Sequence, residues 1–196
     1  KGIGASYNNL GLIYEKQGED VKALKFYTLS LDAKRKSGDP KSIASTLNNI
    51  GVIYKKQEYF TKAIEYYREA ISINRKSGNQ EFLLINYYNI ANCFKGLHNG
   101  DSALYYYNIG SALSLEIDKH TDYANILHAK GNYYIDIADY KRGMELVDRS
   151  KQIVDQYQVR FADYLYYEAK GRAFFGLGNL DSAEVYLMKS WLEKKD

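Results

Sequence analysis

The sequence repeats itself at a fixed interval of 40 residues, and this period constrains the fold more than any other feature. Five copies follow one another without an insertion, and four positions in each copy largely keep their chemical character. These positions form a large apolar column at Leu10, Ile50 and Ile90, a small column at Gly11, Gly51, Ala91, Gly131 and Gly171, an aromatic column at Tyr14, Tyr54, Phe94, Tyr134 and Phe174, and a second small column at Ala23, Ala63, Ala103, Gly143 and Ala183. A period of this length indicates stacked units that each contact their neighbours.

Each unit is predicted to contain two amphipathic helices. In the first half, Tyr7, Leu10, Gly11 and Tyr14 recur at the i, i+3, i+4 and i+7 positions that share one helical face. The second half carries apolar residues around the second small column. No strand pattern competes with this periodicity, so the fold class is predicted as all-α. Ten helices are expected at about 2–17, 20–36, 40–57, 60–76, 80–97, 100–117, 120–137, 140–157, 160–177 and 180–195.

Turn residues separate the predicted helices. Gly18 and Gly178 interrupt their units, and left-handed C-terminal caps are predicted at Gly38 and Gly78. The only proline follows an aspartate, which predicts Asp39 as an N-cap and Pro40 as the first helical residue. Polar N-caps for second helices are predicted at Asn99, Asp139 and Asn179.

The glycines of the first small column fall inside helices, where Gly costs about 1 kcal/mol relative to Ala. Their recurrence at one phase predicts that a partner helix approaches closely there. The single cysteine, Cys93, falls in an apolar column. We therefore expect it to be a buried packing residue and not a nucleophile.

Composition excludes several classes of protein. The chain is 45% hydrophobic and 26% charged, and its 21 tyrosines suit a thin core that lies close to water. The net charge of +3 is spread along the chain, which argues against a nucleic-acid partner. One cysteine precludes an internal disulfide, and the sequence has no metal-ligand cluster. It has no apolar run of 18 residues for a membrane span and no visible signal peptide.

The order of these columns resembles the tetratricopeptide repeat. The matching residues of the first unit are Tyr7, Leu10, Gly11, Tyr14, Gly18, Ala23, Tyr27 and Ser30; those of the second are Ile50, Gly51, Tyr54, Ala63, Tyr67 and Ala70, with Leu47 in the leading aromatic position. The resemblance extends over the whole chain. It implies a right-handed superhelical solenoid of five helix-turn-helix repeats in a single domain, 1–196, with repeats at about 1–39, 40–79, 80–119, 120–159 and 160–196.

Forty-residue versions of this repeat resemble the arrays of spindle-orientation adaptors, kinesin light chains and bacterial quorum-peptide receptors. The resemblance implies that the first helices line a concave groove that holds peptide. The fourth unit departs most from the pattern, with Gly143 in place of Ala and Val147 in place of an aromatic residue, so its stacking is the least well supported. Because Lys1 already falls inside a repeat, the sequence is expected to be a fragment of a longer chain.

Asparagines recur on the helical face opposite the core columns. Asn is a poor helix former, so its recurrence inside helices needs a reason, and it offers both a donor and an acceptor to a peptide main chain. The predicted peptide-binding residues are Asn8, Asn9, Asn48, Asn49, Lys55, Tyr88, Asn89, Asn92, Lys95, Asn125, His128, Asn132 and Arg172. The resemblance implies that the residues which hold the peptide backbone in the related arrays correspond here to Asn9, Asn49 and Asn89. The alternative is that the asparagines bridge neighbouring helices inside the stack.

Other polar residues on this face have ordinary structural explanations. Each Lys near a helix end also suits the negative end of the helix dipole. His128 is expected to be a hydrogen-bonding side chain. Glu168 and Arg172 are spaced i, i+4 and are expected to pair with each other.

The sequence therefore predicts a protein-protein interaction module that binds a peptide segment of a partner in an Asn-lined groove. The alternative is a sensor or regulatory region of a multidomain bacterial signalling protein, with a histidine kinase or helix-turn-helix output domain. A homodimer is compatible with either. No catalytic constellation is found, so neither enzymatic activity nor a cofactor is expected. A cytoplasmic location is favoured, and a periplasmic one remains for a membrane-anchored sensor.

Overall fold

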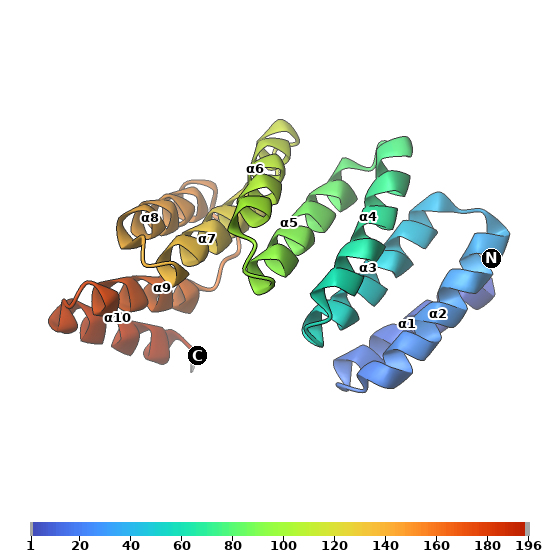
Figure 1. Ribbon diagram of the computed structural model, residues 1–196, viewed down its shortest axis with the longest axis horizontal. Coiled ribbons are helices and arrows are strands. Elements are labelled where there is room, and N and C mark those ends of the chain that lie inside the picture. Colours follow the sequence, from blue (N-terminus) through green and yellow to red (C-terminus); the bar gives the residue numbers. More distant parts are fainter. Residues whose placement is uncertain (1, 195–196) are drawn as a thin grey trace. The chain divides into compact units, whose positions relative to one another are not determined.

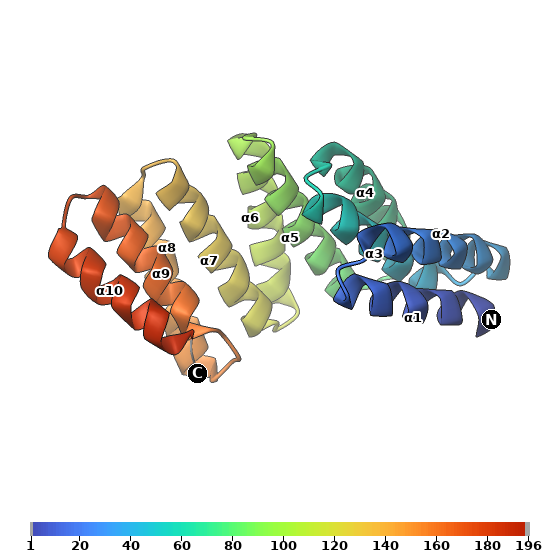
Figure 2. The same ribbon diagram turned by 90° about the horizontal axis from the view of Figure 1, so that it is seen from below.

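The computed structural model describes residues 2–194, and these residues form ten α-helices without a strand (Figures 1 and 2). The predicted all-α class is confirmed. The helices are α1 (Gly2–Lys16), α2 (Asp20–Ser37), α3 (Pro40–Lys56), α4 (Phe60–Lys76), α5 (Gln80–Gly96), α6 (Gly100–Glu116), α7 (His120–Asp136), α8 (Tyr140–Tyr157), α9 (Asp163–Gly176) and α10 (Leu180–Glu193).

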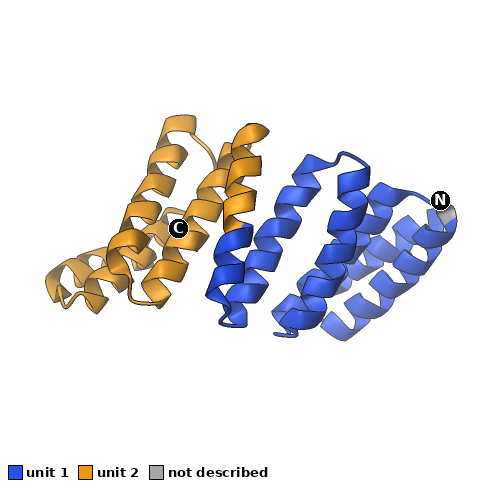
Figure 3. Ribbon diagram, turned by 45° about the horizontal axis from the view of Figure 1, so that its top comes forward, with its two compact units in different colours: residues 1–106 blue, residues 107–196 orange. Residues whose placement is uncertain are grey.

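The helices fall into two compact units, Lys1–Tyr106 and Tyr107–Asp196, with the division inside α6 (Figure 3). In the first unit, the hairpins α1–α2 and α3–α4 pack in sequence, so that α2 lies against α3 and α4 lies against α5. In the second unit, the hairpins α7–α8 and α9–α10 are joined in the same way, through α8 against α9. The first helices of successive hairpins also touch, as α3 does α5 and α7 does α9.

A left-handed backbone conformation recurs every 20 residues and follows each of the helices α1 to α9 at the same phase. The predicted left-handed glycines are confirmed, with φ of 72° at Gly38 and 66° at Gly78. The other residues of the described part with φ between 50° and 75° are Gly18, Glu58, His98, Asp118, Ala138, Gln158 and Gly178. Five of the nine are not glycine, so the repeated packing of the hairpins imposes this conformation on residues that resist it.

The predicted N-caps are confirmed. Each accepts a hydrogen bond from the backbone N–H three residues later, at 3.1 Å for Asn99, 3.3 Å for Asp139 and 3.1 Å for Asn179. Pro40 is the first residue of α3, as predicted, and Asp39 precedes it. The Asp39 carboxylate accepts from the Ser42 hydroxyl and not from a backbone N–H.

Helical glycines set the distance between the two helices of the first two hairpins. A Cβ atom added to Gly11 would lie 2.5 Å from the Tyr27 ring, and one added to Gly51 would lie 2.6 Å from the Tyr67 ring. Contacts this short are forbidden, so in these two hairpins the ring occupies space that a side chain on the glycine would need. The close approach predicted for this column is confirmed.

The aromatic column packs against the second helix of its own hairpin. Nearly parallel rings stack at centroid distances of 5.3 Å for Tyr14–Phe26, 5.5 Å for Tyr54–Tyr66, 5.6 Å for Phe94–Tyr106 and 5.4 Å for Phe174–Tyr186. Offset ring pairs contribute beyond their buried area. This second contact explains why aromatic residues return at this position in these four copies.

The fourth hairpin replaces the ring contact with a close approach of two backbones. A Cβ atom on Gly131 would lie 2.9 Å from the carbonyl oxygen of Gly143, and one on Gly143 would lie 3.0 Å from that of Gly131. Val147, fully buried, fills the remaining space. The substitutions that made this unit the least well supported are therefore complementary, because Gly143 permits the crossing that the smaller Val147 requires.

The connection to the fifth hairpin differs from the prediction. Helix α9 was expected from residue 160 and begins at Asp163 instead, because residues 159–162 are non-helical. The Phe161 ring in this segment contacts His128 edge-on at 5.2 Å, which holds the segment against α7. At the other end, α10 stops at Glu193, and the expected helical residue 195 lies outside the described part.

Replacing Gly131 by Ala tests the backbone crossing of α7 and α8. The new methyl group would meet a carbonyl oxygen that no side-chain rotation can move. We expect Gly131→Ala to lower the free energy of unfolding by about 1–3 kcal/mol, measured by chemical denaturation. Gly2→Ala is the control, because no atom of the described residues outside its own helical turn lies within 4 Å of its added Cβ. Equal effects of the two changes would contradict the proposed packing.

Replacing Ala138 by Gly tests the strain of the left-handed turns. Ala138 has φ of 63°, which costs an L-residue energy that glycine does not pay. We expect Ala138→Gly to raise the stability by about 0.5–1 kcal/mol, whereas Gly178→Ala at the same turn of the next hairpin should lower it by about 1 kcal/mol. Thermal melting of both variants provides the measurement, and changes of the same sign would be contrary to this account.

Candidate functional site

The asparagines of the first unit join successive hairpins through their side-chain carbonyls. The Oδ1 atom of Asn8 accepts from Thr46 at 3.3 Å and from Asn49 at 3.5 Å. One repeat later, Asn48 Oδ1 accepts from Asn86 at 3.1 Å and from Asn89 at 3.3 Å. The same residue positions make the same bonds 40 residues apart. Asn8 and Asn48 therefore bridge neighbouring first helices, as the alternative interpretation of the asparagine column proposed.

Asn89 lies deepest among the predicted site residues of this unit. It is 6% exposed, and its Oδ1 accepts from the Lys55 ammonium at 2.7 Å while its amide donates to Asn48. Burial lowers the pKa of Lys55, since an ammonium group loses hydration there. Asn89 and Lys55 thus stabilise each other inside the stack.

Part of the hydrogen-bonding capacity of this face is not used by the protein. Within residues 2–194, the Nδ2 amides of Asn8 and Asn48 donate to no acceptor, and the Asn49 Oδ1 atom accepts from no donor. Asn9 is exposed and makes no hydrogen bond to the described residues. Since an amide side chain carries two donors and an acceptor, these four residues can still bind an external polar group. We call Asn8, Asn9, Asn48 and Asn49 the amide face.

The remaining predicted residues of the first unit lie on α5. Tyr88, Asn92 and Lys95 are half-buried, and each takes part in a contact with other residues. All three lie on α5, the helix that also carries Asn89.

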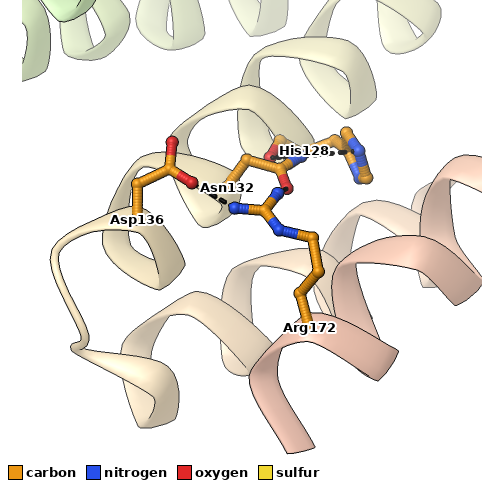
Figure 4. A network of polar contacts seen from close by, with 4 residues as sticks. All are labelled: His128, Asn132, Asp136 and Arg172. Carbon is orange, nitrogen blue, oxygen red and sulfur yellow. Dashed lines mark hydrogen bonds and ion pairs between the residues drawn. The ribbon is translucent and has the colours of Figure 1, made fainter. Parts of the chain in front are cut away.

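In the second unit, three predicted residues, His128, Asn132 and Arg172, form a connected polar network with Asp136 (Figure 4). Arg172 of α9 donates through Nη1 to Asn132 Oδ1 at 3.1 Å and forms an ion pair with Asp136, both on α7. Asn132 in turn lies 2.8 Å from the Nε2 atom of His128, which is 8% exposed. His128 is therefore a hydrogen-bonding side chain of the interior, as expected. Asn125 is half-buried on the same helix.

The expected pairing of Glu168 with Arg172 is wrong. The Arg172 side chain crosses from α9 to α7 and reaches Asp136, the residue 36 positions earlier. An i, i+4 pair on one helix contributes little at the surface, whereas Asn132 and Asp136 together offer the planar guanidinium two acceptors. The geometry of neighbouring hairpins decides between these partners.

Four polar residues beneath the amide face were not predicted. Thr46, Asn74 and Asn86 are fully buried, and Asn74 donates to Asn86 at 3.1 Å. Lys34 donates to Thr46 at 2.8 Å. A signal existed in the sequence, because Thr46 and Asn86 are polar residues 40 positions apart that precede the asparagine column by the same spacing.

Other chemistry is limited in the part of the chain that the structure describes. Cys93 is fully buried, as predicted, and burial raises the pKa of its thiol to about 11. Among residues 2–194, no group of three or more His, Cys, Asp or Glu side chains could hold a metal ion. No helix in the same range is long and apolar enough to cross a membrane.

Replacing Asn89 by Ala tests whether the asparagines hold the hairpins together. The change leaves the half-buried Lys55 ammonium without its acceptor at Asn89 and removes one of the two hydrogen bonds to Asn48. We expect a loss of about 1–3 kcal/mol in the free energy of unfolding. Asn9→Ala should change it by less than about 0.5 kcal/mol, because Asn9 is exposed. If chemical denaturation gave the two variants equal stability, the bridging bonds would carry no energy.

Known proteins resemble this chain in sequence over part of its length and in fold over nearly all of it. The family model described as Tetratricopeptide repeat matches residues 2–76. This match confirms the resemblance noted from the residue columns. No curated protein matches the sequence.

The solved structures that match share the hairpin architecture. BtubC (BKLC) from P. vanneervenii has a TM-score of 0.81 at 21% identity, over 98% of this chain and 81% of that one. A Rap protein complexed with Competence and Sporulation Factor also scores 0.81, at 16% identity, over 97% of this chain and 54% of that one. A putative kinesin light chain from Podosopora anserina scores 0.76 at 14% identity, over 97% and 93%.

These likenesses establish the fold as an array of tetratricopeptide-type hairpins. Such arrays present extended surfaces to other proteins, so the fold supports a protein-protein interaction module. The chain spans about half the length of the Rap protein that it matches.

Proposed function

We propose that the first unit binds an extended peptide segment of a partner protein along the amide face. The observation that carries this proposal is the hydrogen-bonding capacity left over at Asn8, Asn48 and Asn49 after the hairpins have been joined. A peptide main chain offers a carbonyl and an N–H at each residue, which are the complements of these free amide and carbonyl atoms.

The spacing of the hairpins suits a peptide ligand. Neighbouring packed helices lie about 8–10 Å apart, and an extended chain rises about 3.3 Å per residue. About three residues of a bound peptide would therefore span the distance from one hairpin to the next. Asn8 and Asn48 occupy equivalent positions of two such hairpins and are already held in place by bonds from Thr46 and Asn86. A side chain fixed in this way loses little conformational entropy on binding.

A regulatory role in a longer signalling protein is the second candidate. The observation that favours it is the match to a Rap protein, solved with Competence and Sporulation Factor, over only 54% of that chain. In this alternative, the hairpins would bind a signal, and an output domain elsewhere in the protein would respond. Binding of a short free peptide, rather than a segment of a folded partner, would distinguish this role.

An affinity capture experiment tests the proposed binding surface. The native protein and the variant Asn9→Ala/Asn49→Ala are immobilised, and proteins retained from a lysate of the source organism are identified by mass spectrometry. Neither residue is fully buried, and only a 3.5 Å bond to Asn8 is lost, so the variant should fold. We expect the native protein to retain a partner that the variant loses.

The matched control is Gln152→Ala/Gln156→Ala, which removes two exposed amides from α8. It should retain the same partner as the native protein. If the amide-face variant and the native protein retained identical proteins, the amide face would not be the binding surface.

A further inference from the structure

A pocket of about 400 Å³ lies among α4, α5 and α6 of the first unit. It lies mostly against α4, the second helix of its hairpin, and none of the predicted peptide-binding residues lines it. Its wall consists of Arg68, Ile71, Ser72, Arg75, Lys76, Tyr87 and Tyr106. A volume of this size is typical of sites for small ligands or single side-chain groups.

The pocket concentrates positive charge without a negative partner. Arg68, Arg75 and Lys76 all line it, and none of them forms an ion pair with an acidic side chain among residues 2–194. Some other cations of this unit do form ion pairs, such as Arg35 with Glu69 at 2.7 Å and Lys56 with Asp20 at 2.8 Å. Three unpaired cations that share one pocket create a local potential favourable to an anion.

One of the three cations is held in place by the pocket itself. Arg75 donates through Nε at 3.3 Å and through Nη2 at 3.0 Å to the hydroxyl of Tyr87. Its Nη1 group makes no hydrogen bond to the described residues and can donate to a ligand. Ser72 and Tyr106 bring further hydroxyl groups to the wall, and hydroxyls donate to anionic oxygens.

The preceding hairpin does not repeat this arrangement. Forty residues earlier, Asp32 stands in place of Ser72, and Arg35 is engaged by Glu69. The unpaired cationic pocket therefore does not follow from the repeat pattern. It is a local feature of the α4–α6 region, as a specific binding site would be.

We infer that this pocket binds a phosphate monoester. Such a group carries a charge of about −1.5 to −2 near neutral pH and three acceptor oxygens, which matches two guanidinium groups, an ammonium and several hydroxyls. A carboxylate has one charge and two oxygens and would leave part of this set unused. The rings of Tyr87 and Tyr106 and the Ile71 side chain form the apolar remainder of the wall and suit the group that carries the phosphate. The inference is independent of the amide face.

Calorimetric titration with phenyl phosphate tests the inference. We expect saturable binding of one molecule per chain, weakened at least about tenfold in Arg68→Gln/Lys76→Gln and in Arg75→Gln. Arg68 and Lys76 bond to no described residue, so their replacement should leave the melting temperature unchanged. The control Arg149→Gln/Arg160→Gln removes the same charge from exposed positions and should bind as the native protein does.

Inorganic phosphate and phenylacetate serve as comparison ligands. Tighter binding of phenyl phosphate than of inorganic phosphate would support a phosphate carried on an aromatic side chain as the ligand. Equal binding of the two would support a ligand that is recognised by its phosphate group alone. Equal binding of phenylacetate would overturn the preference for phosphate. The absence of saturable binding, or an equal loss in the control variant, would overturn the site itself.

Discussion

The contact between a helical glycine and an aromatic ring of the partner helix determines the geometry of the first two hairpins. Gly11 meets Tyr27 and Gly51 meets Tyr67 at distances that exclude any Cβ atom. The two helices can therefore approach until the large apolar residues of the first helix, such as Leu47 and Ile50, are buried. Since both hairpins have this geometry, equivalent residues of successive hairpins are placed alike.

The amide face is a consequence of this regular placement. Asn48 reaches Asn86 and Asn89 in the same way that Asn8 reaches Thr46 and Asn49, because each pair is separated by one hairpin. The carbonyl of each asparagine joins the hairpins, and its amide remains available. Asn8 and Asn48, for which the sequence left two alternative roles open, can thus serve both, with a different atom for each.

The sequence predicted the helices because each core position is repeated in successive copies. A residue that departs from the pattern in one copy therefore does not hide the pattern that the other copies share. It did not predict the left-handed turns at Glu58, His98 and Ala138, because local preference argues against them and only the packing of the hairpins requires them. The asparagine column could also be recognised, but not which of its atoms are free. That distinction depends on buried partners such as Thr46, on the neighbouring hairpin. The pocket at Arg75 was missed for a similar reason, since its residues lie on three helices.

A double-mutant cycle on Gly51 and Tyr67 tests the glycine–ring constraint most directly. The Tyr67 hydroxyl has no hydrogen-bond partner among residues 2–194, so Tyr67→Leu removes the ring without breaking a polar bond there. The account predicts that Gly51→Ala is strongly destabilising with Tyr67 present and at least about 1 kcal/mol less so with Leu at that position, measured by chemical denaturation. If the two changes were simply additive, the ring would not be what excludes a side chain at Gly51, and the constraint on which the hairpins depend would have to lie elsewhere.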